Sequence, residues 1–154
     1  MRDENWKDHL RSCLENLRII EKSKSDTLEN FNQFCEFIAE PAFEALEQEL
    51  KSYSIKVRFQ KSRGRFIGIK INFPKSKVGN FHYTIWLPKN SVELKLRLKI
   101  KGRRNRKDAL LEREEAFMSG KTPYDIMKLS KEDLIQDIID HYRDFLYEAL
   151  TSPE

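Results

Sequence analysis

The residues closest to a catalytic pattern are Glu93 and Lys95, which are separated by one residue. Many nucleases have this E-x-K spacing at a metal site. Alternate strand residues point the same way, so the carboxylate can hold Mg²⁺ while the lysine supports the attacking water. A second acidic ligand is also needed, and residues 51–91 contain none, so Glu44 or Glu49 would have to supply it. A metal-dependent nuclease, with Glu93 and Lys95 as catalytic candidates, is therefore kept as an alternative; no cofactor or other metal site is predicted.

Cationic side chains are concentrated in the middle of the chain. Residues 51–107 contain 18 Lys or Arg and one acid. Residues 1–50 contain 6 basic and 12 acidic residues, and residues 108–154 contain 5 and 12. The formal net charge of +4 therefore hides a strongly polarised chain. A field of this kind attracts polyanions or an acidic protein surface.

Length and composition are those of one ordinary domain. The chain has 154 residues, 39% of them hydrophobic, and only five Gly and five Pro, which predicts a single folded domain over residues 1–154. No run reaches ~18 apolar residues and the N-terminus is polar, so no membrane contact and no secretion are expected. Cys13 and Cys35 have no metal-ligand spacing and are expected to be free thiols in a reducing cytoplasm.

The first third of the chain has helical periodicity. Apolar residues from Leu10 to Ala45 recur in steps of three and four, which predicts helices within residues 3–51. Pro41 should kink the second helix or begin a third. A single straight helix of this length would span ~70 Å at 1.5 Å per residue, too long for a compact domain. We therefore expect a break near residues 22–27, or else a dimeric coiled coil.

Between residues 52 and 101 the period changes from 3.6 to two. Four alternating runs separated by short polar turns predict an antiparallel β-meander, and the runs are residues 53–60, 66–73, 81–87 and 92–101. Residues 108–150 are predicted to be helical again. The apolar face of the meander must be covered, and only the flanking amphipathic helices can cover it. The predicted fold class is therefore α+β: N-terminal helices, a four-stranded antiparallel meander, and C-terminal helices packed on its apolar face.

The strand phase predicts which side chains share the open face of this sheet. Lys and Arg neutralise phosphates, and flat rings are platforms on which unpaired bases stack. We therefore predict a non-catalytic polyanion-binding module whose ligand is nucleic acid. The predicted binding residues on the sheet are Lys56, Arg58, Phe66, Lys70, His82, Trp86, Lys95, Arg97, Lys99 and Lys101, and the loop that follows adds Arg103, Arg104, Arg106 and Lys107.

The same charge pattern is compatible with two alternatives to nucleic-acid binding. Open faces of antiparallel sheets are commonly rich in Lys, Arg and Thr, and edge lysines block unwanted strand pairing, so the face could simply be solvated. Residues 26–49 contain seven acids and no base. Such an acidic helix surface could cover the basic sheet of a second copy or of the same chain, or a partner protein could supply the acidic surface instead. A protein-interaction or self-association domain, with a homodimer as one form, is therefore kept beside the nuclease as an alternative function.

Overall fold

The computed structural model describes residues 2–72, 80–102 and 111–151. Five strands form one antiparallel sheet in the order β1-β2-β3-β4-β5. The elements are α1 (Arg2–Phe34), a π-helical turn η1 (Cys35–Ala39), α2 (Glu40–Lys51), β1 (Lys56–Ser62), β2 (Phe66–Asn72), β3 (Phe81–Trp86), β4 (Arg97–Gly102), β5 (Leu111–Ala116), α3 (Pro123–Met127) and α4 (Lys131–Thr151). The predicted α+β class is confirmed, with a fifth strand added. Within the described ranges no helix is long and apolar enough to cross a membrane.

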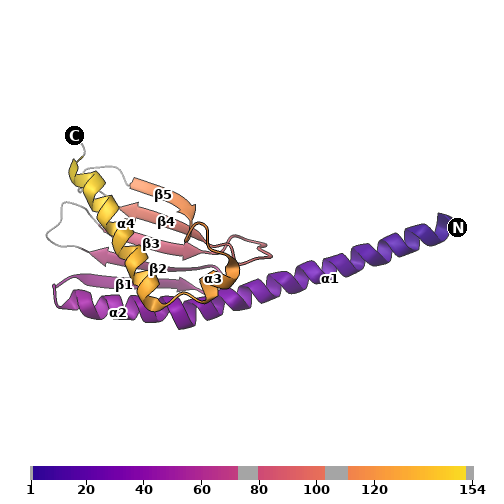
Figure 1. The fold of residues 1–154 in the computed structure, drawn as a ribbon, viewed down its shortest axis with the longest axis horizontal. Helices are drawn as coiled ribbons and strands as arrows, with labels where there is room; N and C mark the ends of the chain where they lie inside the picture. The colour runs from indigo at the N-terminus through magenta and orange to yellow at the C-terminus, as the bar shows by residue number, and fades with distance from the viewer. Residues whose placement is uncertain (1, 73–79, 103–110, 152–154) are drawn as a thin grey trace.

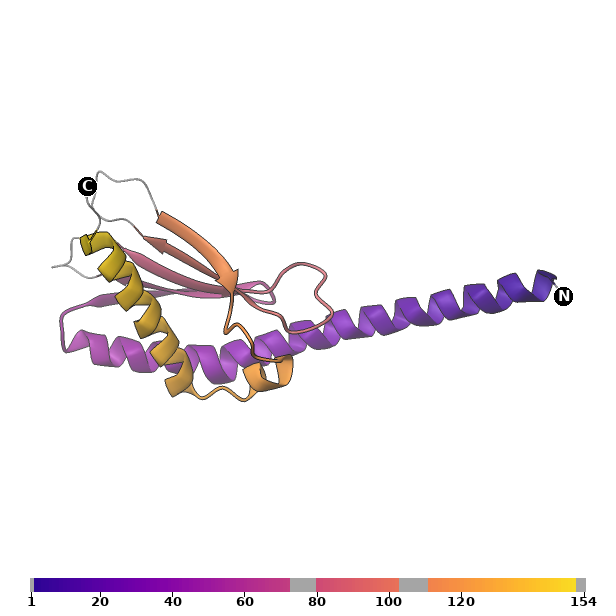
Figure 2. The same cartoon turned by 45° about the horizontal axis from the view of Figure 1, so that its top comes forward.

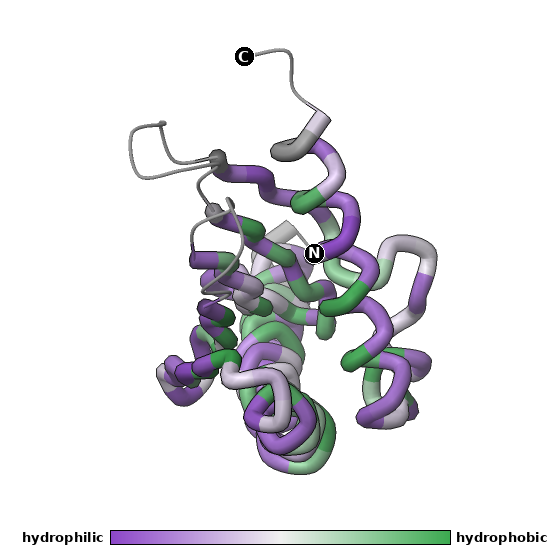
Figure 3. Tube along the Cα trace, turned by 90° about the vertical axis from the view of Figure 1, so that its left-hand side faces the viewer, coloured by the Kyte–Doolittle hydropathy of each residue, from purple (hydrophilic) through white to green (hydrophobic). Residues whose placement is uncertain are grey.

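The hydrophobic core lies between the sheet and the helices. Figure 3 shows hydrophobic and hydrophilic residues alternating along the strands, with the helices on one side of the sheet. The inward side chains of the strands, such as Ile69, Tyr83 and Ile85, are at most 2% exposed. They belong to one core cluster with Phe43 of α2 and Ile138 of α4. The period-two pattern therefore buries one face of the sheet, as alternation requires.

The predicted break at residues 22–27 is wrong. α1 is one continuous helix, and its first part extends as an arm beyond the rest of the molecule (Figure 1). The predicted break assumes that the whole chain is compact. In the structure the first part of α1 projects from the globular body instead of folding back on it (Figure 1). Serines inside a helix cost only tenths of a kcal/mol each, and Glu21 and Lys24 form an ion pair of 3.7 Å across one turn. Thr27, 3% exposed, is where the helix meets the body.

Pro41 is accommodated by the π-helical turn that precedes it. A proline inside an α-helix lacks an N–H donor and its ring clashes with the carbonyl four residues earlier. Here the N–H of Glu40 donates to the carbonyl of Cys35, five residues back, and Pro41 falls in the first turn of α2. The prediction that Pro41 would kink a helix or begin a new one is therefore close to the observed geometry.

β5 corrects the prediction that residues 108–150 are helical. Leu111–Ala116 consists of good helix formers, which is why the sequence favours a helix. In the structure β5 pairs antiparallel with β4, and Glu112 and Glu114 lie beside cations of that strand. Cross-strand pairs between opposite charges stabilise a sheet, so tertiary pairing overrides the local preference here.

Both C-terminal helices begin at side-chain caps. Thr122 caps α3 through a reciprocal pair of hydrogen bonds with Asp125. At the start of α4, the N–H of Asp133 donates to Ser130 Oγ and the N–H of Ser130 donates to Asp133 Oδ2, each at 3.1 Å. The aspartate thus performs the role that glutamate usually has in a capping box.

A polar network ties α4 to the buried side of the sheet. Tyr83 donates its hydroxyl to Asp137 Oδ2 at 2.5 Å. His141 contacts the backbone carbonyl of Asp137 through Nδ1 at 2.8 Å and Glu115 Oε1 through Nε2 at 3.0 Å. The hydrogen bond to the Asp137 side chain is the main reason why the pKa of His141 is raised to about 9. The imidazolium is therefore the form that the folded protein favours.

This raised pKa makes stability depend on pH. Because the folded-state pKa of His141 lies above its unfolded value, its contribution is complete below about pH 6.5 and is lost as the pH rises through about 9. We expect His141→Gln to lower the free energy of unfolding by about 1–2 kcal/mol near pH 6, allowing for solvent screening at Glu115, and by far less near pH 10. Urea unfolding of both proteins at the two pH values measures this. An equal difference at both values would contradict it.

Candidate nucleic-acid interface

The predicted strand phase is confirmed on the polar side of the sheet. Cross-strand pairing places Arg58, Lys70, His82 and Lys101 in one row and Phe66, Trp86 and Arg97 in another. The described helices lie on the other side (Figures 2 and 3). We call this surface the basic face, and its residues are Lys56, Arg58, Gln60, Phe66, Lys70, His82, Thr84, Trp86, Arg97, Lys99, Lys101, Glu112 and Glu114.

β5 makes one end of the basic face less cationic than the sequence suggests. Lys99 Nζ lies 2.9 Å from Glu112 Oε1, and Arg97 Nε lies 3.7 Å from Glu114 Oε1. The hydrogen bond between Lys99 and Glu112 lowers the pKa of the carboxyl and raises that of the ammonium, so both stay charged. Two of the predicted binding cations are therefore already paired with acids of the same chain.

The remaining cations of the face are unpaired in the described part of the chain. Lys56, Arg58 and Lys70 on β1 and β2, and Lys101 on β4, form no ion pair among the described residues. Each of them is exposed or half-buried. Positive charge that is not neutralised internally attracts phosphates or carboxylates from outside. Three of these unpaired cations therefore lie on β1 and β2. The fourth, Lys101 on β4, is separated from Lys70 by His82 in the same row.

A hollow of about 620 Å³ lies on the basic face around its two large rings. Phe66 and Trp86 line it together with cations from β4 and from the turns at the ends of β2 and β3. The indole Nε1 of Trp86 is buried and has no hydrogen-bond partner among the described residues. A buried donor without a partner is costly. The lining residues are Gln60, Arg65, Phe66, His82, Thr84, Trp86, Leu87, Lys89, Lys99, Lys101 and Glu114.

His82 adds a third ring to this hollow. Burial is the main reason why its pKa lies below the usual histidine value, and the nearby Lys70 and Lys101 lower it further. The imidazole is therefore neutral at physiological pH and offers a flat aromatic surface. A bound phosphate would offset the two ammonium groups and raise the pKa of His82, so an anion should bind more tightly as the pH falls.

Lys95 does not lie on the sheet. The predicted strand 92–101 begins only at Arg97, so Glu93 and Lys95 stand in the loop before β4. Their side chains pair with each other at 3.2 Å and are 58% and 79% exposed. Leu94 and Leu96 are buried, which produces the alternation in the sequence, but the sheet pairing of this segment begins only at Arg97. The carbonyl of Leu96 accepts the N–H of Phe117, just after β5, at 2.9 Å. Glu93 and Lys95 therefore lie on the same side of their segment, but before the start of β4.

The acids proposed to complete a metal site with Glu93 lie on another element. Glu44 and Glu49 belong to α2, whereas Glu93 lines a hollow at the base of the arm together with Asp26. Among the described residues there is no group of three or more His, Cys, Asp or Glu that could hold a metal ion. The remaining predicted binding residues, Arg103, Arg104, Arg106 and Lys107, lie outside the described residues.

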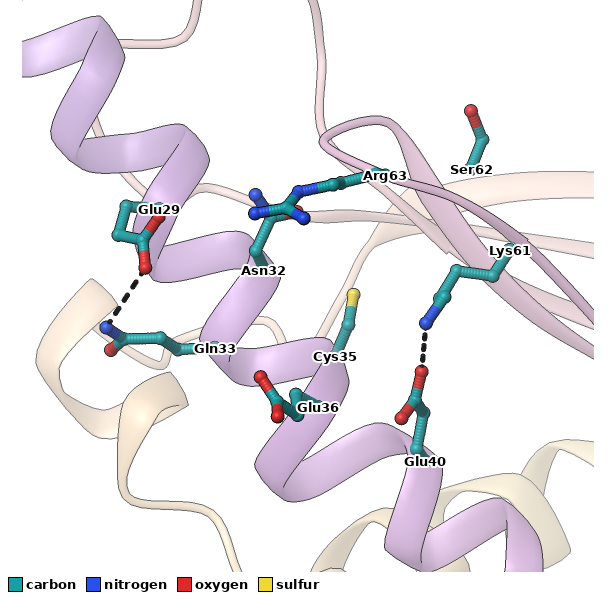
Figure 4. A pocket seen from close by; sticks show the side chains of 9 residues that line it. All are labelled: Glu29, Asn32, Gln33, Cys35, Glu36, Glu40, Lys61, Ser62 and Arg63. Atoms are coloured by element: carbon teal, nitrogen blue, oxygen red, sulfur yellow. Dashed lines mark hydrogen bonds and ion pairs between the residues drawn. The ribbon is translucent and has the colours of Figure 1, made fainter.

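A second hollow, of about 260 Å³, lies between the N-terminal helices and the turn that joins β1 to β2 (Figure 4). Glu40 pairs with Lys61 across it, so part of the acidic helix surface already meets a base of the same chain. Asn32 Oδ1 accepts the N–H of Gly64 at 2.9 Å and fixes this turn. Burial raises the pKa of the Cys35 thiol to about 12, so this cysteine is protonated and unreactive.

Several residues of the basic face and of its hollow have little signal in the sequence and were not predicted as binding residues. Glu112 and Glu114 alternate with Arg113 and Glu115, so β5 has no hydropathy pattern of a half-buried strand. Arg65 and Lys89 lie just outside β2 and β3 and reach the hollow from the turns. Their positions depend on the course of the turns, which strand alternation does not determine.

Comparison with protein-family models, with curated proteins and with solved structures gave no match. A function for this chain must therefore come from the chemistry of its own side chains.

Proposed function

We propose that the basic face binds a polyanion without catalysing a reaction, and that its ligand is a single-stranded nucleic acid. The observation that carries this proposal is the cross-strand register. It places a row containing Arg58, Lys70 and Lys101 on the same side of the sheet as a row containing Phe66 and Trp86, with the row of Gly68, Thr84 and Lys99 between them. The described helices leave this side open (Figure 3). Binding of a single strand has two requirements: cations that contact its phosphates, and aromatic rings on which its bases stack.

The shape of the surface favours a single strand over a duplex. Phe66 and Trp86 lie side by side in a hollow on the sheet rather than on a projecting element. Bases of a duplex are stacked on each other and cannot stack on such rings, whereas unpaired bases can. Both described cysteines, Cys13 and Cys35, are free, and a reducing cytoplasmic location belongs to the proposal.

An acidic protein surface is the second candidate ligand. The ion pairs of Arg97 with Glu114 and of Lys99 with Glu112 favour it. They show that cations of this face bind carboxylates of a protein chain. A partner protein could extend the pattern to Arg58 and Lys70. Such a ligand would compete with nucleic acid for the cations but would have no planar bases to stack on Trp86.

Trp86 distinguishes the two ligands. If a base stacks on the indole, Trp86→Ala should weaken binding of a single-stranded oligonucleotide by ~1–3 kcal/mol, which is about 5- to 150-fold. Fluorescence anisotropy with a labelled oligonucleotide measures the change. Phe37→Ala is the matched control, because Phe37 is an aromatic residue of η1 that is 68% exposed and lies outside the basic face. Equal affinities of the two folded variants would contradict a stacked base.

A further inference from the structure

The arm, residues 6–24 of α1, carries an apolar stripe with no partner in the described structure. It projects from the body in both side views (Figures 1 and 2). The large side chains of the stripe are about half exposed, from 42% at Ile20 to 55% at Leu17. The same helix buries Thr27, Phe31 and Phe34 where it meets the body. One continuous stripe is therefore covered along the body and uncovered along the arm.

The stripe has the spacing of a coiled coil. Its positions alternate between steps of four and three, which keeps one seam facing a partner helix at 3.5 residues per turn. Within the arm, only Lys24 breaks the apolar character, at the point where the arm joins the body. The seam consists of Trp6, Leu10, Cys13, Leu17, Ile20 and Lys24, and continues as Thr27, Phe31 and Phe34.

We propose that the arm pairs with the arm of a second copy of this chain as an antiparallel two-stranded coiled coil. The position of the body favours this direction. Because Thr27 and Phe31 are buried against the body, the body lies on the side of the helix that the seam faces. A parallel pair would bring two bodies to the same end and into the same space. It would also place Lys24 opposite Lys24 in one layer.

The antiparallel direction gives complementary layers over the arm. Pairing Leu10 with Ile20 of the second copy also places Cys13 opposite Leu17 and Trp6 opposite Lys24. These layers are apolar except for the last, in which an ammonium group can lie over an indole. The seam of one arm is thus matched by the reversed seam of the other.

The flanking positions of the antiparallel pair are complementary as well. In this register Lys7 lies beside Glu21 of the second copy, and the twofold symmetry makes that contact twice. Leu14, which is 51% exposed beside the seam, meets Leu14 of the second copy near the symmetry axis. Opposite charges and an additional apolar contact therefore support the same register.

The base of the arm offers a place for the end of the second arm. Leu28, Val92 and Tyr124 are 45%, 48% and 67% exposed there. Hollows of about 270 and 400 Å³ lie on the two sides of α1 at this level, one lined by Lys24 and Leu28 and the other by Val92 and Tyr124. Trp6 of the second copy reaches this level in the proposed register, so its ring would cover apolar surface that is otherwise exposed.

Sedimentation equilibrium of the full chain, without nucleic acid, tests the association over about 1–100 μM protein. We expect a dimer whose dissociation constant rises more than about 100-fold in Leu17→Glu, because each dimer would bury two unpaired carboxylates. Ile19→Glu is the matched control: Ile19 is 63% exposed and lies off the seam. It should change the constant less than about 3-fold. A monomer at every concentration, or equal effects of the two variants, would overturn the proposal.

Oxidative cross-linking tests the direction of the two arms. In a parallel pair Cys13 faces Cys13 of the second copy and should form an intermolecular disulfide, whereas in the antiparallel pair the two thiols are about four residues apart along the axis, beyond disulfide reach. We expect no Cys13 disulfide under mild oxidation, and a cross-linked dimer for Cys13→Ser with Leu14→Cys. A wild-type disulfide dimer through Cys13 would overturn the antiparallel direction. Neither result depends on whether the basic face binds nucleic acid.

Discussion

Replacing Arg58 and Lys70 together by glutamate should weaken binding of a single-stranded oligonucleotide by about 100-fold or more at low salt. The two residues are cross-strand neighbours on β1 and β2, and neither forms an ion pair among the described residues. The double change removes two phosphate contacts and introduces repulsion. The fold should survive, because one pair of like charges is exchanged for another at exposed or half-buried positions. Anisotropy titrations at one fixed salt concentration measure the effect.

The control is a second double variant that changes the net charge by the same amount at a different place on the protein. Lys121→Glu with Lys131→Glu alters two exposed lysines next to α3 and α4, away from the basic face. We expect it to weaken binding by no more than about 3-fold, through the overall field of the protein alone. If the two double variants bound equally weakly, the location of the charges would not matter, and the basic face would lose its role.

The largest expected effect on stability comes from Gly102 at the end of β4. A Cβ at this position would lie 2.3 Å from Phe145 Cζ and 2.7 Å from its Cε1. Phe145 is 5% exposed and packs against Phe81, so its ring has little room to move. We expect Gly102→Ala to lower the free energy of unfolding by about 3 kcal/mol, at the upper end of the usual cost of overpacking. Urea unfolding monitored by circular dichroism measures the loss.

A double-mutant cycle isolates this contact. Phe145→Leu alone leaves a void and should also destabilise the protein. Combined with Gly102→Ala, it removes the ring that the new methyl group would strike, so the double variant should be clearly more stable than the sum of the two single costs implies. Strictly additive costs would show that Gly102 is required for a reason other than the closeness of Phe145.

Strand phase and helix caps were predictable from the sequence because short-range rules determine them. The alternation from Ile67 to Ile71 places Phe66 and Lys70 on the polar side of the sheet, and this does not depend on which elements pack on the apolar side. Ser130 and Asp133 mark the start of α4 because their side chains satisfy backbone N–H groups of its first turn. The rows of the basic face follow from such local rules once the strands pair in chain order.

β5 was not predictable, because its tertiary pairing with β4 decides it, and for the N-terminal helix the sequence left a break or a dimeric coiled coil open. Glu112 and Glu114 favour a helix locally and become strand residues only beside Lys99 and Arg97. The expected break at residues 22–27 assumes that every apolar stripe is covered within one chain, which the exposure of the arm contradicts. The charge balance of the basic face depends on β5, so the sequence overstates how cationic that face is.

The salt dependence of binding is the most direct test of the claim that the basic face holds a phosphodiester chain. A labelled single-stranded oligonucleotide is titrated with the folded wild-type protein at several salt concentrations, with anisotropy as the readout. We expect saturable binding at low salt and a log–log slope of about −3, the value for roughly four phosphates neutralised on a single strand. Four cations of the face, Lys56, Arg58, Lys70 and Lys101, form no ion pair among the described residues and could supply them. No binding by the folded protein at low salt would contradict the claim.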